Sequence, residues 1–160
     1  MSDLYDVAAI ASQVRDRQVV LANGCFDILH VGHVRYLEGA RALGDVLVVA
    51  LNDDESVRAL KGPGRPIMTL EDRAALLIAL EAVDYVVAFS GPDVGPVIEV
   101  LRPSVHAKGT DYTEDDVPER DVVRRYGGQI RIAGDPKDHS TRDVLARILK
   151  NISRDTGSTE

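Results

Sequence analysis

The sequence has a single cysteine, Cys25, no tryptophan, and no apolar run long enough to cross a membrane. One cysteine excludes an intrachain disulfide and a zinc site built from several cysteines. Such a low cysteine content is typical of proteins in a reducing compartment. Residues 1–17 lack the basic start and the continuous apolar stretch of a signal peptide. We therefore expect a cytoplasmic protein without a membrane partner.

Basic residues are also scarce: 19 Lys and Arg stand against 26 Asp and Glu, giving a formal net charge of −7. This balance argues against nucleic acid as a partner, although a local basic pocket could still bind a small phosphate compound. The 160 residues, 44% of them hydrophobic, suit one domain with its own core. We expect that domain at 1–150, opened by a helix within 1–17, and a flexible polar tail at 151–160.

Five short β-rich runs are candidate strands, and the first three lack clean polar alternation, as parallel strands covered on both faces do. They are residues 19–22, 46–51, 85–89, 104–107 and 129–133. Helical patterns precede, separate and follow them, at 4–16, 31–43, 55–60, 69–80, 94–101, 117–126 and 141–149. The alternation predicts a doubly wound, Rossmann-like α/β domain, whose five-stranded parallel sheet has helices on both faces. Ligands of such sheets bind beyond the carboxyl ends of the strands.

The loop after the first strand carries the most informative stretch, NGCFDILHVGH at 23–33. His30 and His33 are three residues apart, so at the start of a helix they project from neighbouring positions of the first turn. The N–H groups and the dipole of that helix end favour an anion, and two imidazoles can donate further hydrogen bonds to it. Gly24 and Gly32 would let a ligand approach the backbone. The stretch therefore predicts a phosphate site, with two ordinary histidines at a helix end as the plain alternative.

Other interpretations of the same stretch are weaker. His30, His33, Asp27 and Cys25 are potential metal ligands, but histidines at i and i+3 without a convincing third and fourth ligand are a poor zinc site. Cys25 lies in an apolar stretch, which favours a small buried residue over a nucleophile. For Asp27 two roles stay open: orienting backbone or metal-bound water near the histidines, and stabilising the turn.

Residues 23–33 closely resemble the signature of the cytidylyltransferase-like nucleotidyltransferase superfamily, with its H-x-G-H element. The resemblance covers most of residues 18–149, in order. It includes ARALGDVLVVALNDD at 40–54, KGPGRPI at 61–67, EDRAALLIALEAVDYVV at 71–87, KGTDY at 108–112 and HST at 139–141. Within the superfamily the chain is most similar to the adenylyltransferases that make ADP-heptose from D-glycero-β-D-manno-heptose 1-phosphate and ATP.

The resemblance implies transfer of a nucleotidyl group from a nucleoside triphosphate to a phosphate-bearing acceptor, with release of pyrophosphate. In such a reaction catalysis is mostly positioning and electrostatic stabilisation. The resemblance assigns the stabilising part to His30 and His33, and a phosphate contact to Lys61 in a loop that could fold over a triphosphate. Arg65 would be a second cation there. Taken alone, Lys61 would fit a solvated loop lysine better.

The resemblance also implies a set of nucleotide-binding residues on three loops. They are Asn23, Gly24, Cys25, Phe26, Asp27, Gly32, Arg65, Lys108, Gly109, Asp111, Ser140 and Thr141. Plain alternatives remain, because Lys108 and Asp111 could belong to a surface turn, and Ser140 or Thr141 could simply cap the last helix. Relatives carry Thr where this chain has Arg142, and Gly where it has Thr110, and these two departures bear on the acceptor. Arg142 could pair with a sugar phosphate or be solvated.

Magnesium is the expected cofactor, with ATP as co-substrate, and it would bind mainly through the nucleotide phosphates. The resemblance also suggests a homodimer. Related bifunctional enzymes carry a sugar kinase domain for which 160 residues leave no room, so we expect a separate kinase to supply the sugar phosphate. Two alternatives stay open: a cytidylyltransferase that uses CTP and a polyol or amino-alcohol phosphate, and a non-catalytic nucleotide-binding module.

Overall fold

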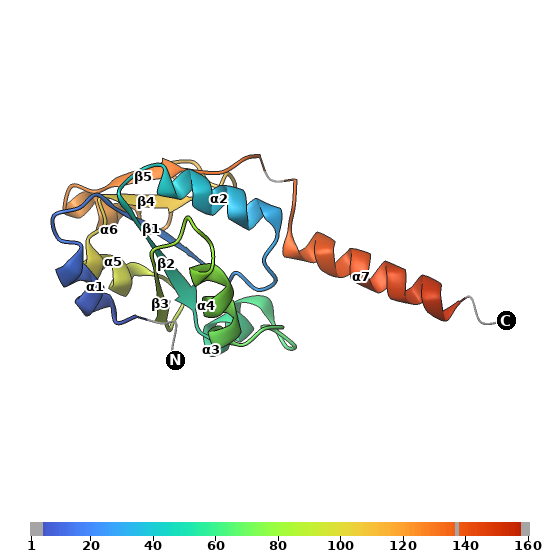
Figure 1. Ribbon diagram of the computed structural model, residues 1–160. Coiled ribbons are helices and arrows are strands. Elements are labelled where there is room, and N and C mark those ends of the chain that lie inside the picture. Colours follow the sequence, from blue (N-terminus) through green and yellow to red (C-terminus); the bar gives the residue numbers. More distant parts are fainter. Residues whose placement is uncertain (1–4, 137, 158–160) are drawn as a thin grey trace.

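The computed structural model describes residues 5–136 and 138–157 and contains one five-stranded parallel sheet. The strands lie in the order β3-β2-β1-β4-β5, and Figure 1 shows helices on either side of them. The strands are β1 (Val19–Gly24), β2 (Val46–Asn52), β3 (Tyr85–Phe89), β4 (Val105–Lys108) and β5 (Gln129–Ile132). The predicted doubly wound, Rossmann-like α/β fold is confirmed.

The central strands are buried because their sequences are apolar on both faces. Every residue of β2, VLVVALN, is buried, and β2 pairs in parallel with both β1 and β3. The first four residues of β1 are buried, whereas Asn23 and Gly24 at its end are half-buried. The polar end of β1 is therefore where the chain leaves the core.

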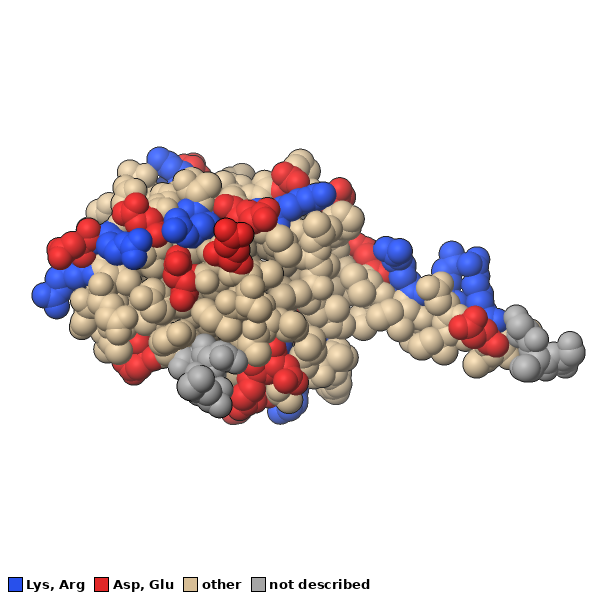
Figure 2. Space-filling view, viewed as in Figure 1, with Lys and Arg blue, Asp and Glu red and all other residues tan. Residues whose placement is uncertain are grey.

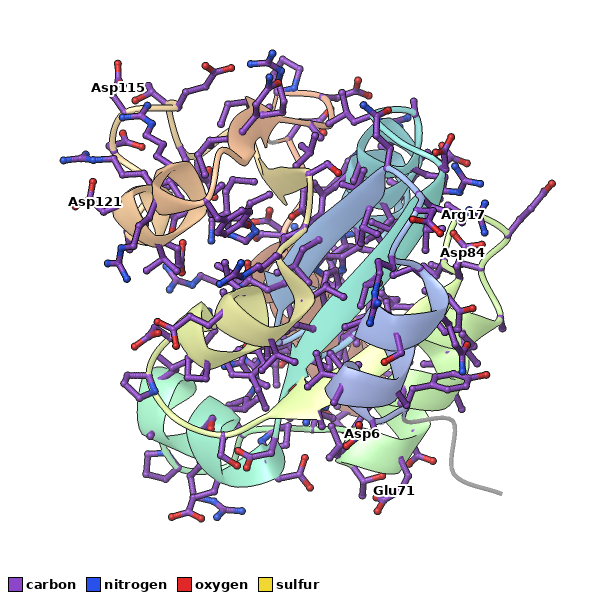
Figure 3. The ribbon with its side chains drawn as sticks, turned by 90° about the vertical axis from the view of Figure 1, so that its left-hand side faces the viewer. Asp6, Arg17, Glu71, Asp84, Asp115 and Asp121 are labelled. Carbon is purple, nitrogen blue, oxygen red and sulfur yellow. The ribbon has the colours of Figure 1, made fainter. Side chains whose placement is uncertain are left out.

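Two buried apolar clusters lie on opposite faces of the sheet. The helices are α1 (Val7–Gln13), α2 (Val31–Arg41), α3 (Asp54–Lys61), α4 (Leu70–Ile78), α5 (Gly95–Leu101), α6 (Arg120–Arg125) and α7 (Thr141–Thr156). Ile10 of α1, Ile98 of α5 and Val123 of α6 belong to one cluster. Leu37 of α2 and Leu77 of α4 belong to the other. Figure 3 looks onto the first face and shows α1, α5 and α6 in front of the strands.

The first helix is shorter than the sequence predicts. Asp6 precedes α1 and accepts a hydrogen bond from Ala9 N at 2.9 Å, so the helix starts at Val7 instead of near Leu4. An Asp at this position satisfies a free N–H group of the first turn, which fixes the start. Leu4 itself lies outside the described residues.

The last helix is longer than predicted. α7 continues to Thr156, so residues 151–156 are helical and do not form the flexible polar tail expected there. No glycine or proline interrupts residues 141–156, and Gly157 follows as the C-cap. Residues 158–160 of the predicted tail lie outside the described part of the chain.

α7 projects away from the rest of the molecule (Figure 1), and Figure 2 shows it standing clear with several Lys and Arg side chains. Along its described length α7 has no buried residue. Ile148, Leu149 and Ile152 expose 47%, 66% and 56% of their surfaces. Within the described residues, no helix combines the length and apolar character needed to cross a membrane.

The helices that follow β1 and β4 lie on opposite faces of the sheet. β1 and β4 are neighbours, yet α2 after β1 packs on one face, and α6 after β4 packs on the other. Diverging connections of this kind open a crevice at the carboxyl ends of the two strands. The crevice therefore lies at the edge of the sheet where the sequence predicts a ligand site.

Candidate active site

A cavity of about 980 Å³ lies at the carboxyl ends of β1 and β4. The loops after β1, β4 and β5, the end of α3, and the starts of α2 and α7 form its walls. Every site residue predicted from the sequence lines it: His30, His33, Lys61, Asn23, Gly24, Cys25, Phe26, Asp27, Gly32, Arg65, Lys108, Gly109, Asp111, Ser140 and Thr141. Residues far apart in the sequence thus meet around one hollow, while the roles assigned to them remain predictions.

His30 and His33 fix each other at the start of α2. His30 precedes the helix, and its Nδ1 accepts a hydrogen bond from Gly32 N at 3.1 Å. His33 Nδ1 accepts one from His30 N at 3.3 Å, and the two rings stack with centroids 3.8 Å apart. Because each Nδ1 accepts from the backbone, the hydrogen of each neutral ring is assigned to Nε2. Two Nε2–H donors beside a helix N-terminus suit an anion better than a cation.

Gly32 and Gly24 make room for side chains of the protein itself, whereas the sequence predicts that they make room for a ligand. A Cβ added at Gly32 would lie 3.0 Å from the His30 ring and 3.4 Å from the Cβ of His139. One added at Gly24 would lie 3.1 Å from the Phe26 ring. The two glycines therefore let the loop after β1 pack its own rings closely.

Asp27 is buried, and its carboxylate holds the loop between α3 and α4. Oδ2 accepts hydrogen bonds from Arg65 Nε at 2.7 Å and Ile67 N at 2.8 Å, and Oδ1 accepts one from Met68 N at 3.0 Å. Burial raises the pKa of Asp27, but the two amides and the Arg65 guanidinium outweigh it and hold the pKa below its usual value. Asp27 therefore stabilises a loop, and its engaged oxygens argue against a role with metal-bound water.

Lys61 and Arg65 flank this cavity in different ways. Lys61 ends α3 and is exposed, whereas Arg65 is tethered to Asp27 with 20% of its side chain exposed. Gly62 and Gly64 between them have φ of 97° and 82°, a region that glycine enters without steric cost. The loop therefore offers one fixed cation and one that is free to turn toward an anion.

Hydroxyl groups at the start of α7 have partners within the protein. Ser140 Oγ accepts a hydrogen bond from Asp143 N at 3.1 Å and donates one to Asp143 Oδ2 at 2.7 Å, so Ser140 caps the last helix, one of the roles that the sequence leaves open for it. Thr141 Oγ1 donates to Asp27 O at 2.9 Å. Arg142 also lines the cavity and is exposed. The helix start thus presents hydroxyls, N–H groups and a cation to one wall.

Lys108 forms part of the cavity floor at the end of β4. Its Nζ lies 3.3 Å from Asn23 Oδ1 and 4.7 Å from the centre of the Tyr112 ring. Burial lowers the pKa of Lys108, and the nearby Glu119 carboxylate opposes this only in part. Only 7% of Lys108 is exposed, so the plain interpretation as a surface turn is wrong for this residue, although Asp111 is exposed.

A profile of the cytidylyltransferase-like family matches residues 21–146, a stretch that runs from β1 into α7. The chain belongs to the cytidylyltransferase-like family. Among solved structures, the lipopolysaccharide core biosynthesis protein from Thermoplasma volcanium GSS1 is 30% identical with a TM-score of 0.62, over 72% of this chain and 93% of that protein. The nucleotidyltransferase enzyme class expected from the sequence is thereby confirmed.

Further similarities extend this family assignment. Bifunctional protein HldE of Geobacter sulfurreducens is 48% identical over 140 residues, 88% of this chain and 29% of the relative. Its counterpart in Alcanivorax borkumensis is 48% identical over 149 residues, 92% of this chain and 31% of the relative. The chain therefore spans less than a third of these relatives. Pantothenate synthetase from Thermus thermophilus, 19% identical with a TM-score of 0.57 over 86% of this chain and 62% of that protein, shares the fold.

Sequence reasoning missed one buried residue that shapes the site of this cytidylyltransferase-like domain. Arg73 of α4 has no exposed surface and donates to Cys25 O at 2.7 Å, Asn52 O at 2.9 Å and Met68 O at 3.1 Å. Its Nη2 also contacts Asp54 Oδ1 at 2.6 Å. Arg73 thus ties together the ends of β1 and β2 and the loop before α4. Arg73 lies one helical turn before the buried Leu77, and this spacing was the sign in the sequence that Arg73 is on the buried face of α4.

The metal and nucleophile alternatives receive little support from this geometry. Over residues 5–136 and 138–157, no group of three or more His, Cys, Asp and Glu side chains is placed to hold a metal ion. Burial raises the pKa of Cys25, whose Sγ lies 3.8 Å from Asn52 Oδ1. A protonated thiol is a poor nucleophile, so Cys25 fits a small packing residue.

Proposed function

We propose that this chain transfers AMP from ATP to a sugar 1-phosphate, forming an ADP-sugar and pyrophosphate. The observation that carries the proposal is the pair of imidazoles at the start of α2, held with Nδ1 toward the backbone inside a large cavity. Family membership supports nucleotidyl transfer. The sequence resemblance favours ATP and a heptose 1-phosphate, and the similarity to a lipopolysaccharide core biosynthesis protein agrees with a sugar acceptor.

The chemistry requires little of the protein beyond placement and charge. An acceptor phosphate oxygen attacks the α-phosphorus of ATP, so that a new P–O bond forms on the acceptor. The bond from the α-phosphorus to the bridging oxygen of the β-phosphate breaks, and pyrophosphate leaves with that electron pair. The attacking oxygen is already anionic near neutral pH, so no general base is needed. Negative charge gathers on the α-phosphate and on the leaving group, where donors and cations stabilise it.

The residues around the cavity divide this work. His30 and His33 donate from Nε2 to the α-phosphate, assisted by the N-terminus of α2. Lys61, exposed at the end of α3, turns toward the departing phosphates, and Arg65 remains tethered to Asp27. Lys108 contributes its charge from the floor. The start of α7 completes the phosphate-binding wall.

Magnesium fits the site as a companion of ATP. The Asp27 oxygens accept three hydrogen bonds from protein donors, so this carboxylate is poorly suited to hold a metal ion. A cation bound mainly through the β- and γ-phosphates would neutralise their charge. This chain's own contribution is then to orient the phosphates through Lys61 and the start of α2.

The test is a substrate screen with the purified chain. ATP, Mg²⁺ and each member of a panel of sugar 1-phosphates are incubated with the protein, and pyrophosphate release and ADP-sugar mass are measured. We expect turnover with heptose 1-phosphate and ATP. Turnover only with CTP and a polyol or amino-alcohol phosphate would identify a cytidylyltransferase instead. Nucleotide binding without turnover of any pair would favour the non-catalytic module.

Two expectations about partners are part of the proposal. A sugar kinase is needed to supply the 1-phosphate group, because this chain only consumes it. We also propose a homodimer, and the exposed Ile148, Leu149 and Ile152 of α7 offer apolar surface for it. Light scattering should then give twice the 17.4 kDa mass of the chain, and a value equal to that mass would reject the dimer.

A further inference from the structure

Three ionisable side chains are buried together behind the cavity floor, on the face of the sheet that α6 covers. His106 and Lys108 are two residues apart on β4 and therefore point to the same face. Glu119, the residue before α6, approaches both: its Oε2 lies 3.5 Å from His106 Nε2 and 3.7 Å from Lys108 Nζ. The side chains of His106, Lys108 and Glu119 are 0%, 9% and 8% exposed.

Burying this group is expensive for the fold. His106 pairs in register with Leu21 of β1 and Ile130 of β5, so its neighbours along the sheet are apolar. Replacing buried ions by well-packed apolar side chains is often neutral or stabilising, so stability alone does not account for them. Buried charges beside a ligand cavity are more typical of functional sites.

The three side chains differ in their access to the cavity. Among the described residues, Lys108 lines the cavity, whereas His106 and Glu119 lie behind it. The Lys108 stem has several rotatable bonds, and its ammonium contacts Asn23 and the Tyr112 ring, both uncharged. The Glu119 carboxylate is the opposite charge beside it. Glu119 therefore forms the ion pair of Lys108 in this structure.

We propose that Glu119 is a positioning residue that fixes the Lys108 ammonium at the cavity floor, where it meets a substrate phosphate. This inference rests on the proposed function, because it takes the ligands to be phosphate compounds. His106 Nε2 lies 3.5 Å from the same Glu119 oxygen, so both of these β4 side chains face the carboxylate. Glu119 touches no substrate in this arrangement and acts through Lys108.

The same contact keeps Lys108 protonated. Burial lowers the pKa of Lys108 and Glu119 raises it, so loss of the carboxylate leaves burial unopposed. Two other titratable groups lie close by: His106 two residues earlier on β4, and Tyr112 in the loop after β4, whose ring centre is 4.7 Å from the ammonium. Asp111 of the same loop also lines the cavity. A Glu119→Gln variant should therefore release the Lys108 proton at lower pH than the parent chain.

The first experiment measures this proton without using the enzyme's activity. The chain has four lysines, so ¹³C labelling of the lysine ε-carbons gives few NMR signals, and the Lys108 signal is the one missing in Lys108→Met. In Glu119→Gln we expect the Lys108 transition to move to lower pH. Asp121→Asn is the matched control: Asp121 lies two residues further along, its side chain is 84% exposed, and Figure 3 shows it on the outside of α6. It should leave the transition unmoved.

The second experiment is a double-mutant cycle on the nucleotidyl transfer reaction. Glu119→Gln should lower kcat/KM about tenfold, as expected for a disturbed contact to a charged group. In the Lys108→Met background the same substitution should cause no further loss, because its route of action is gone. Glu119→Asp, which keeps the carboxylate, should recover much of the activity and of the Lys108 transition. Asp121→Asn should match the parent chain.

The outcomes separate this inference from the proposed function. An unmoved Lys108 transition in Glu119→Gln would overturn the positioning role. So would a loss of kcat/KM on Glu119→Gln that is equal in the parent chain and in the Lys108→Met background. If Glu119→Gln does not fold by circular dichroism, Glu119→Asp decides. A Lys108 transition and a kcat/KM like those of the parent chain support the role. A Lys108 transition at clearly lower pH, as expected when no carboxylate faces the ammonium, rejects it. If the folded parent chain turns over no phosphate substrate, the proposed function fails, and the NMR titration still decides whether Glu119 controls Lys108.

Discussion

The hydroxyl of Thr141 donates a hydrogen bond to the carbonyl oxygen of Asp27, 2.9 Å away, and joins the start of α7 to the loop after β1. The Asp27 carboxylate meanwhile holds Arg65 and the amides of Ile67 and Met68. One buried residue thus connects three segments that line the cavity. The shape of the site depends on this connection as much as on the groups that would touch substrate.

Asp27→Asn should loosen the loop between α3 and α4. The side-chain amide of the variant can still accept hydrogen bonds, but it has no negative charge to pair with Arg65. We therefore expect the free energy of unfolding to fall by about 1–3 kcal/mol. Urea denaturation at pH 7 measures the change. The exposed Asp16→Asn serves as the control and should stay near the parent value. Equal stability of Asp27→Asn and the parent chain would contradict the role given to this carboxylate.

The stabilisation by Asp27 should also depend on pH. Because the pKa of Asp27 is lowered in the folded chain, its contribution is complete above the usual aspartate pKa and is lost as the pH falls through the lowered value. The stability difference between the parent chain and Asp27→Asn should therefore be constant near neutral pH and shrink in acid. Urea denaturation curves between neutral pH and the acid range measure it, and a difference that grew in acid would show the opposite sign.

His30→Asn should separate the two nitrogens of the imidazole. The Asn side-chain oxygen can replace Nδ1 as acceptor from Gly32 N, so α2 should keep its cap, but the Nε2 donor is gone. We expect kcat to fall about 100-fold, as for loss of one oxyanion donor, with little change in the melting temperature. Steady-state kinetics and thermal unfolding test this. A kcat close to that of the parent would remove His30 from the proposed chemistry.

Gly32→Ala should disturb the same ring without changing its chemistry. The added methyl would lie 3.0 Å from the His30 ring, so the ring or the backbone must shift. We expect kcat to fall about tenfold, because small displacements of aligned groups are costly. Gly157→Ala is a suitable control, since its added Cβ meets atoms at 3.5 Å or more and its φ is −89°. Kinetics of both variants compare them directly, and equal kcat values would argue against the need for a fixed His30.

Arg73→Leu should be among the most destabilising substitutions in the chain. It leaves the buried carbonyl oxygens of Cys25 and Asn52 without their donor, so a loss of about 3–5 kcal/mol is expected. Arg58→Leu on the exposed side of α3 should change stability by less than about 0.5 kcal/mol. Chemical denaturation of both variants distinguishes them. A small effect of Arg73→Leu would mean that the strand ends are held by other contacts.

Local patterns were sufficient to predict the strands and most of the helices. The apolar runs at β2 and β3 match the prediction within a residue, and Ser140 caps α7, which was one of its predicted roles. Caps and buried strands depend on residues close in sequence, which a pattern can reveal. The prediction of a flexible tail from residue 151 is wrong because a polar composition does not by itself end a helix, and no helix-breaking residue precedes Gly157 within α7.

By itself, the sequence determined the α/β fold, the order of its elements and the residues that gather at the carboxyl ends of β1 and β4. Only the tertiary structure decided that Asp27 holds Arg65, that Gly32 makes room for the His30 ring, and that Glu119 lies behind Lys108. The physical reason is that periodicity and capping act between near neighbours in the chain. The partner of a buried charge is set by which strands pair and which face each helix covers.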